Sequence, residues 1–110
     1  MSFLYKGREI LTDNEGFLKN LSDWDEDMMS FMAEADGQDL TEAHIYVICA
    51  VRKYYEEFAT TPPMRGLIAY LKKSDHPDLA KSVALARLFP DGAAKTAARY
   101  AGLPKPVKCI

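Results

Sequence analysis

The chain has 110 residues, of which 48% are hydrophobic and 27% are charged, which suits one folded domain with a single core. Mixed charges and frequent aromatic residues exclude a disordered chain, and no apolar run approaches the roughly 20 residues of a membrane span. The two cysteines, Cys49 and Cys109, are too few for a disulfide framework or a zinc site, so we expect a cytoplasmic protein without metal or cofactor.

The net charge of −2 is distributed unevenly along the chain. Residues 1–45 hold 3 Lys/Arg and 11 Asp/Glu, a net of −8, whereas residues 46–110 hold 11 Lys/Arg and 5 Asp/Glu, a net of +6. Such an asymmetry can orient a molecule toward charged partners, and the alternative is an ordinary solvated surface of mixed charge. Composition leaves both interpretations open.

The first residues predict a short β-hairpin. Residues 3–5 and 8–11 form the two candidate strands, and Gly7 between them can adopt the positive φ that a tight turn needs. Residues 12–16 are polar and predict a turn after the hairpin.

Three helices are expected next. We interpret Ser22 as the N-cap of the first, with Asp25 three positions later, and Gly37 as its end. Thr41 caps the second, and Thr61 precedes the proline pair that starts the third. The side chains expected to face the core at helical spacing are Trp24, Met28, Phe31, Met32 and Ala35, then Val47, Ile48, Val51, Tyr54, Tyr55 and Phe58, then Met64, Leu67, Ile68 and Leu71.

Two more helices complete the domain. His76 and the proline after it open the fourth, and residues 89–92 break it. Its inward side chains are predicted to be Leu79, Val83, Ala86 and Leu88. The fifth helix, 93–101, is small and basic, and Gly102 is placed to be its left-handed C-terminal cap.

The last seven residues differ from the rest of the chain. Pro104 and Pro106 favour extended backbone, so residues 104–110 should project as an arm of up to about 25 Å, with Cys109 next to its end. We predict one domain over residues 1–103 followed by this flexible arm. The expected fold class is mainly α, a small orthogonal bundle of about five helices with an N-terminal β-hairpin.

The arm is the strongest candidate for chemistry. A thiolate is the reactive form of cysteine, and Lys105 and Lys108 favour ionisation of Cys109, whereas the carboxylate of Ile110 opposes it. An exposed thiolate can take the outer sulfur of a persulfide and hold it as Cys–S–SH. The alternative is that Cys109 is only a thiol in a disordered tail.

Other candidate sites have structural interpretations. Cys49 lies among apolar residues of a helix and is expected to be a packing residue. His44 and His76 are far apart in sequence, one in the first turn of a helix and one before a proline. The carboxylates at 23–27 crowd a helix N-terminus, where the helix dipole favours them.

A basic docking surface around the arm is predicted from Lys95, Arg99, Lys105 and Lys108. Its partner would be an acidic protein rim or a tRNA held by an acceptor. The segments 62–73 and 93–101 also resemble a helix-turn-helix variant, but the second is short of base-reading groups such as Asn and Gln. DNA binding therefore remains a third alternative.

Nearly the whole chain resembles the DsrC/TusE family. The residues that carry the resemblance are 101–110 (Ala-Gly-Leu-Pro-Lys-Pro-Val-Lys-Cys-Ile), 88–92 with Lys95, 7–10, 12–13, 15–18, 40–42, 51–52, Tyr55, 57–58, Pro62 and Arg65. The ending is the most specific part, because the cysteine is penultimate and follows Gly-Leu-Pro-Lys-Pro. One departure is Ala93, where many relatives have proline.

The resemblance implies a sulfurtransferase that accepts a persulfide sulfur on Cys109 and relays it toward 2-thiouridine at the wobble position of tRNA. The implied partners are a donor complex resembling TusBCD and a tRNA 2-thiouridylase resembling MnmA, with a possible indirect contact to tRNA and none to a membrane. The DsrC branch, the gamma subunit of dissimilatory sulfite reductase, has a second reactive cysteine at the position of Ala98. A gamma-subunit-like or regulatory partner of sulfite reductase is therefore the alternative.

Overall fold

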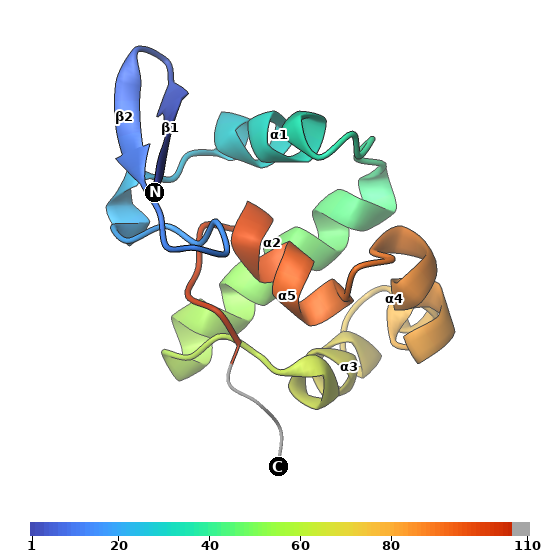
Figure 1. Ribbon diagram of the computed structural model, residues 1–110. Helices are drawn as coiled ribbons and strands as arrows, with labels where there is room; N and C mark the ends of the chain where they lie inside the picture. The colour runs from blue at the N-terminus through green and yellow to red at the C-terminus, as the bar shows by residue number, and fades with distance from the viewer. Residues whose placement is uncertain (107–110) are drawn as a thin grey trace.

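The computed structural model describes residues 1–106, so the predictions for positions 107–110, including Lys108 and Cys109, lie outside the described residues. Within the described range the fold consists of an N-terminal β-hairpin, five α-helices and two short 3-10 helices (Figure 1). The predicted class, a small and mainly α-helical bundle with an N-terminal hairpin, is confirmed. None of the helices within residues 1–106 has both the length and the apolar character that crossing a bilayer requires.

The hairpin forms as predicted. Strands β1 (Ser2–Tyr5) and β2 (Arg8–Leu11) pair antiparallel, and the two residues between them make the turn. Lys6 and Gly7 both have positive φ, 49° and 78°, which is the backbone of a two-residue turn whose twist matches that of the strands.

The first α-helix begins later than predicted. Ser22 lies in the 3-10 helix η1 (Leu21–Asp23), and α1 (Glu26–Ala35) is capped by Asp25 instead, whose carboxylate accepts a hydrogen bond from the Met28 amide at 2.9 Å. Two residues in this stretch are good N-caps, and contacts with the hairpin decide between them. The hairpin's tyrosine hydroxyl and lysine ammonium both bind the Asp25 carboxylate.

The buried face of α1 is also rotated from the predicted one. Its buried side chains are Met28, Met29, Met32 and Ala33. Ala35 is exposed, Trp24 precedes the helix, and Phe31 is 38% exposed. Phe31 stacks on Phe3 and packs edge-on against Tyr5, with ring centroids 5.6 and 5.1 Å apart. The helix thus uses one aromatic residue to hold the hairpin rather than to fill the core.

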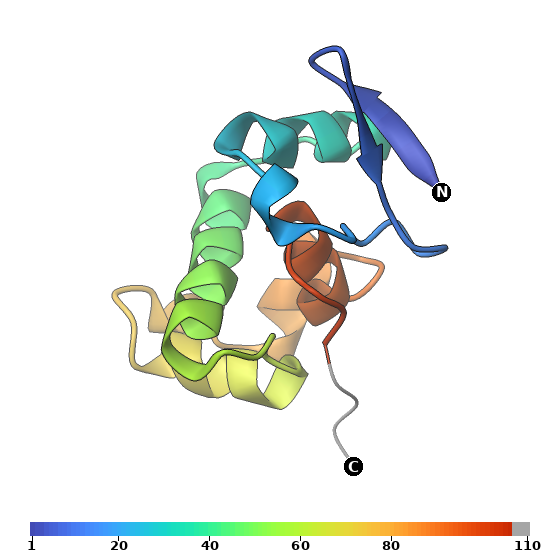
Figure 2. The same cartoon turned by 90° about the vertical axis from the view of Figure 1, so that its left-hand side faces the viewer.

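The long helix α2 (Glu42–Phe58) runs along one side of the bundle, from the end of α1 to the start of α3 (Figure 2). Gly37, with φ of 73°, ends α1, and Thr41 caps α2, both as predicted. His44 completes a reciprocal capping box with Thr41. The helix ends at Ala59, whose backbone is left-handed. The side chains that α2 buries are His44, Val47, Ile48, Ala50 and Val51.

Helix α3 (Met64–Lys72) starts after Pro63, as expected, but the prediction of one fourth helix from His76 is wrong. The chain forms the 3-10 helix η2 (Pro77–Leu79) and then α4 (Ser82–Leu88). Between them Ala80 is buried and has a non-helical backbone, φ −83° and ψ 46°.

This break changes which side chains of α4 face inward. Val83 is 64% exposed and Ala86 is exposed, contrary to prediction, whereas Leu85 is fully buried. Leu79 and Leu88 are partly buried, as expected. The prediction assumes one uninterrupted helix from His76. Because Ala80 is not helical, the residues after it face different directions from those that a continuous helical period would give them.

The last helix, α5 (Ala93–Tyr100), packs against α2 in the core. Ala97 and Ala98 are fully buried, and their small side chains let the two helices approach closely. Tyr100 is among the largest fully buried side chains. The predicted break before α5 and the cap after it are both present, and α5 thereby leads directly into the C-terminal arm.

Candidate functional site at the root of the C-terminal arm

The C-terminal arm, residues 104–110, begins just beyond α5. Residues 104–106 are described, and the chain leaves the bundle there (Figures 1 and 2). Cys109, the predicted sulfur-carrying residue, and Lys108, one of the predicted docking residues, lie beyond them. The described geometry therefore concerns how the arm is anchored and which groups surround its root.

Two backbone hydrogen bonds close the end of α5. The Gly102 amide donates to the Arg99 carbonyl at 3.1 Å, and the Leu103 amide donates to the Ala98 carbonyl at 3.0 Å. This is the Schellman arrangement, which needs a left-handed residue, and Gly102 has φ of 70°. A Cβ at Gly102 would also lie 2.4 Å from the Trp24 ring, so glycine is required there for two reasons.

Two side chains bind the final carbonyl groups of the helix. The Arg52 guanidinium donates from Nη1 to the Ala101 carbonyl at 2.6 Å, and the Trp24 indole donates from Nε1 to the Tyr100 carbonyl at 2.8 Å. The guanidinium carbon of Arg52 lies 3.8 Å from the centroid of the Trp24 ring, so the two side chains also stack.

The structure brings together three of the predicted docking residues, and each is paired with an acidic residue. Glu15 binds Lys95 at 3.2 Å and Lys105 at 2.8 Å. Arg99 pairs with Asp36. The acidic partners come from the first 45 residues, so the two oppositely charged parts of the chain meet at the root of the arm. In the free protein this surface is a set of ion pairs rather than an unopposed positive patch.

Glu15 is positioned by a local turn. The carboxylate of Asp13 accepts hydrogen bonds from the amides of Glu15 and Phe17, at 2.8 and 3.0 Å. The ammonium groups of Lys105 and Lys95 lower the pKa of the Glu15 carboxyl below its usual value. Glu15 therefore remains a negatively charged bridge between α5 and the arm.

Neither histidine forms a catalytic group among the described residues. His44 is buried, accepts the Thr41 amide at Nδ1 over 3.1 Å, and donates from Nε2 to the Leu88 carbonyl over 2.7 Å. It ties the start of α2 to the end of α4. His76 is exposed and lies edge-on to the Tyr46 ring at 4.4 Å.

The acidic cluster at 23–27 has structural contacts. Asp25 is the N-cap of α1, and Lys6 binds Asp25 at 3.3 Å and Asp27 at 2.9 Å. Arg8 lies 3.8 Å from Asp23. These carboxylates hold the hairpin against the start of the helix.

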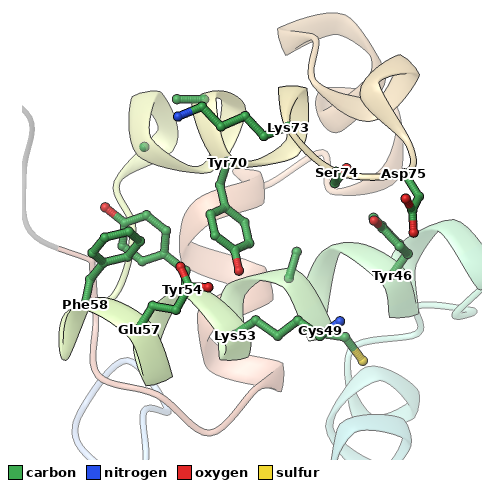
Figure 3. A pocket seen from close by; sticks show the side chains of 13 residues that line it. Tyr46, Cys49, Lys53, Tyr54, Glu57, Phe58, Tyr70, Lys73, Ser74 and Asp75 are labelled. Atoms are coloured by element: carbon green, nitrogen blue, oxygen red, sulfur yellow. The ribbon is translucent and has the colours of Figure 1, made fainter.

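The expectation that Cys49 is a packing residue is wrong, because its side chain is exposed. It lines a groove of about 670 Å³ between α2 and α3. In Figure 3, Tyr70 reaches from α3 toward α2 beside Tyr54, and Cys49 lies farther along the same helix as Tyr54. The Tyr54 and Tyr70 ring centroids are 5.5 Å apart.

A signal for the exposure of Cys49 was present in the helical period. Val47, Ile48 and Val51 are buried and define the inner face of α2. At about 100° per residue, Cys49 lies roughly 150° from the middle of that face. Its apolar neighbours in sequence were therefore a poorer guide than its position on the helix.

Comparison with known proteins places these features in a family. The chain matches the family model described as DsrC like protein over residues 4–110. It is 46% identical over 106 residues to Sulfurtransferase TusE of Yersinia pseudotuberculosis, covering 96% of this chain and 98% of the relative. Sulfurtransferase TusE of Escherichia coli strain K12 is 44% identical over 107 residues, with 97% and 98% covered.

Solved structures show the same fold. The NMR structure of Allochromatium vinosum DsrC superposes with a TM-score of 0.88 at 39% identity. The crystal structure of the oxidized gamma-subunit of the dissimilatory sulfite reductase from Archaeoglobus fulgidus gives 0.83 at 35% identity. Both superpositions cover 100% of each chain.

Proposed function

We propose that this chain, which belongs to the DsrC family of proteins, is a TusE-type sulfurtransferase that carries sulfur as a persulfide on Cys109 in the relay for tRNA thiolation. The observation that carries this function is the identity of 44–46% over nearly the full length to proteins named Sulfurtransferase TusE. The two prolines that precede Cys109 in the arm support the assignment of the carrier role to this residue.

The transfer chemistry needs no added oxidant or reductant. The Cys109 thiolate attacks the outer sulfur of a donor persulfide, a new S–S bond forms at Sγ, and the donor's S–S bond breaks. The donor leaves as a thiolate, and Cys109 holds the outer sulfur as Cys–S–SH. The same exchange in the next step moves this sulfur to a thiol of the acceptor.

An arm suits this exchange because the thiol must enter two different partner sites. Pro104 and Pro106 restrict the backbone, which lowers the conformational entropy lost when a partner binds the arm. The seven residues from 104 to 110 span up to about 25 Å when extended. The domain, residues 1–103 in this proposal, then serves as the anchor and docking body.

We further propose a donor complex of the TusBCD type, an acceptor of the MnmA type and a cytoplasmic location. Lys95, Arg99, Lys105 and Lys108 would dock on an acidic rim of these partners, and any contact with tRNA would be through the acceptor. Since Glu15 and Asp36 already hold the three described basic residues, a partner's carboxylates must exchange with them.

This exchange predicts how docking responds to charge and salt. Lys95→Gln with Lys105→Gln should slow association with the acidic partner and reduce its salt dependence, because exposed charges mainly set the association rate. Lys81→Gln, at an exposed position before α4, is the matched control and should dock like the parent. Stopped-flow measurements over a salt series give the association rate constant and its salt dependence for each variant. Equal rates for the double variant and the parent at every salt concentration would rule out the docking surface.

A second candidate, a gamma-subunit-like partner of sulfite reductase, is favoured by the superposition on DsrC chains. The family's two-cysteine chemistry needs a thiol at the position of Ala98. That position is a fully buried alanine in α5, so the chain lacks this second thiol. The alternative that remains is a subunit that binds sulfite reductase without taking part in redox chemistry.

Intact mass tests the carrier role directly. After incubation with a small persulfide donor, the mass should rise by about 32 Da, one sulfur atom, and return on thiol reduction. Cys109→Ser should show no stable gain under conditions in which Cys49→Ser loads like the parent. Cys49 is the appropriate control because it is the other cysteine of the sequence and its side chain is exposed. Loading that depends on Cys49 and survives Cys109→Ser would refute the assignment.

A further inference from the structure

The backbone at the root of the arm is held by side chains from two distant parts of the chain. Arg52 comes from α2 and Trp24 from the connection between η1 and α1. Their donors bind the Ala101 and Tyr100 carbonyls at 2.6 and 2.8 Å. The 3.8 Å stacking of the guanidinium on the indole joins the two donors into one unit, which we call the arm clamp.

The clamp acts on peptide groups that a helix end leaves without partners. The last four carbonyls of an α-helix have no donor within the helix, and a positive charge near them is favourable. Arg52 supplies both the donor and the charge. The Trp24 ring also lies where a Cβ of Gly102 would be, so it limits the space into which this turn can move.

Direction is the property that these contacts control. The peptides of Tyr100 and Ala101 come immediately before the turn at Gly102, and Leu103 after it is buried. Pro104 and Pro106 have fixed φ, which removes two of the backbone rotations in residues 104–106 and so limits how far an orientation set at Gly102 is lost along them.

We propose that Arg52 and Trp24 are positioning residues that fix the direction in which the C-terminal arm leaves the domain. This proposal rests on the proposed function for its consequence, which is that a fixed direction raises the fraction of arms ready to enter a partner's site. A partner binds only that fraction, so the apparent affinity falls in proportion when the fraction falls.

The geometry can be measured without any transfer reaction. One spin label goes on Cys49, which is native and exposed, and the other on Lys105→Cys in a Cys109→Ser chain, which keeps both Pro104 and Pro106. Pulsed electron paramagnetic resonance then gives the distribution of distances between them. Arg52→Lys keeps the charge but loses the planar group that stacks, and Trp24→Phe keeps a ring but loses the indole donor. Both should broaden the distribution.

Arg87→Lys is the matched control, because Arg87 is exposed on α4 and, among the described residues, makes no hydrogen bond to the root of the arm. It should leave the distribution unchanged. Circular dichroism and the thermal midpoint show which variants remain folded, and Arg52→Lys is the conservative choice should Trp24→Phe unfold. A folded Arg52→Lys with the parent's distribution would overturn the clamp.

The functional readout uses the same substitutions with Cys109 intact. The KM for the acceptor in sulfur transfer should rise up to about tenfold while kcat and chemical loading of Cys109 stay unchanged, because only the ready fraction falls. An unchanged KM despite a broadened distribution would refute the positioning role. If the parent itself never takes up sulfur, the proposed function fails, whereas the distance measurement still decides the clamp.

Discussion

Glu15 is the residue at which the acidic and basic parts of the chain are most directly connected. Its carboxylate reaches Lys95 on α5 and Lys105 on the arm, 80 and 90 positions away in sequence. Both lysines lower the pKa of Glu15. A carboxyl with a lowered folded pKa stabilises the fold above its unfolded pKa and loses that contribution as pH falls through the folded value.

The sign of this linkage predicts the behaviour of Glu15→Gln. The parent should have the higher thermal midpoint at pH values above the ordinary glutamate pKa of 4.5, and the two midpoints should converge as pH falls below the folded pKa of Glu15. Glu9→Gln, on the exposed edge of the hairpin, is a control for removing a carboxylate. Calorimetry from pH 2 to 7, a range of about five units around the titration, measures the difference. A gap that persists at the lowest pH would contradict the account.

At the scale of elements, α1 and α5 end in the same way but in different surroundings. Each is closed by a Schellman pair of hydrogen bonds around a left-handed glycine, Gly37 for α1 and Gly102 for α5. A Cβ at Gly37 would meet nothing within 4 Å, whereas one at Gly102 would meet the Trp24 ring at 2.4 Å. A side chain at Gly37 would therefore meet backbone strain alone, whereas a side chain at Gly102 would meet the same strain and a clash with Trp24.

Alanine at the two positions should have unequal effects. Gly37→Ala should lower the free energy of unfolding by about 1 kcal/mol, the cost of a left-handed alanine. Gly102→Ala should lower it by about 3 kcal/mol, because displacing the packed Trp24 ring adds a further one to three. Urea unfolding of both variants measures the difference. Equal decreases in the free energy of unfolding for the two variants would show that the Trp24 ring moves aside without an energetic penalty and does not restrict the turn.

At the scale of the whole molecule, local signals were enough for most elements. The hairpin follows from a glycine turn between two short candidate strands, and the cap at Thr41 and the end at Gly102 follow from residues with strong preferences. The sequence alone does not fix the start of α1, because Ser22 and Asp25 are both good caps, and the cap in the structure is Asp25, which also binds the hairpin.

Two kinds of feature are harder to predict from the sequence: those that depend on the phase of a helical period and contacts between residues far apart in the chain. The non-helical backbone at Ala80 shifts the period of the fourth helix, and no proline or glycine marks it. The apolar sequence neighbours of Cys49 predict a packing residue, whereas its angular position on α2 indicates the exposed side chain that the structure has. The bond from Arg52 to Ala101 joins residues 49 positions apart, a contact that periodicity and capping rules do not predict.

The candidate site likewise has one part that the sequence predicts and one part that only the fold shows. Cys109 was predicted from its position at the end of a proline-stiffened arm, and it stays a prediction beyond the described residues. The basic residues around the arm were predicted from charge, but their acidic partners Glu15 and Asp36 come from the other end of the sequence. The sequence shows which groups are available, and only the fold shows which of them are already paired.

A single-turnover transfer from the loaded chain tests most directly whether Cys109 passes its sulfur on. Chain carrying a persulfide is mixed with a tRNA 2-thiouridylase, its tRNA substrate and ATP, which converts the uridine C2 oxygen into a leaving group. Thiols of the 2-thiouridylase supply, by forming a disulfide, the two electrons that reduce the transferred sulfur. The Cys109 persulfide and the 2-thiouridine are quantified at the same time points. We predict that 2-thiouridine appears one for one with the loss of persulfide from Cys109 and that Cys109→Ser gives none. Equal formation of 2-thiouridine with Cys109→Ser would contradict the account.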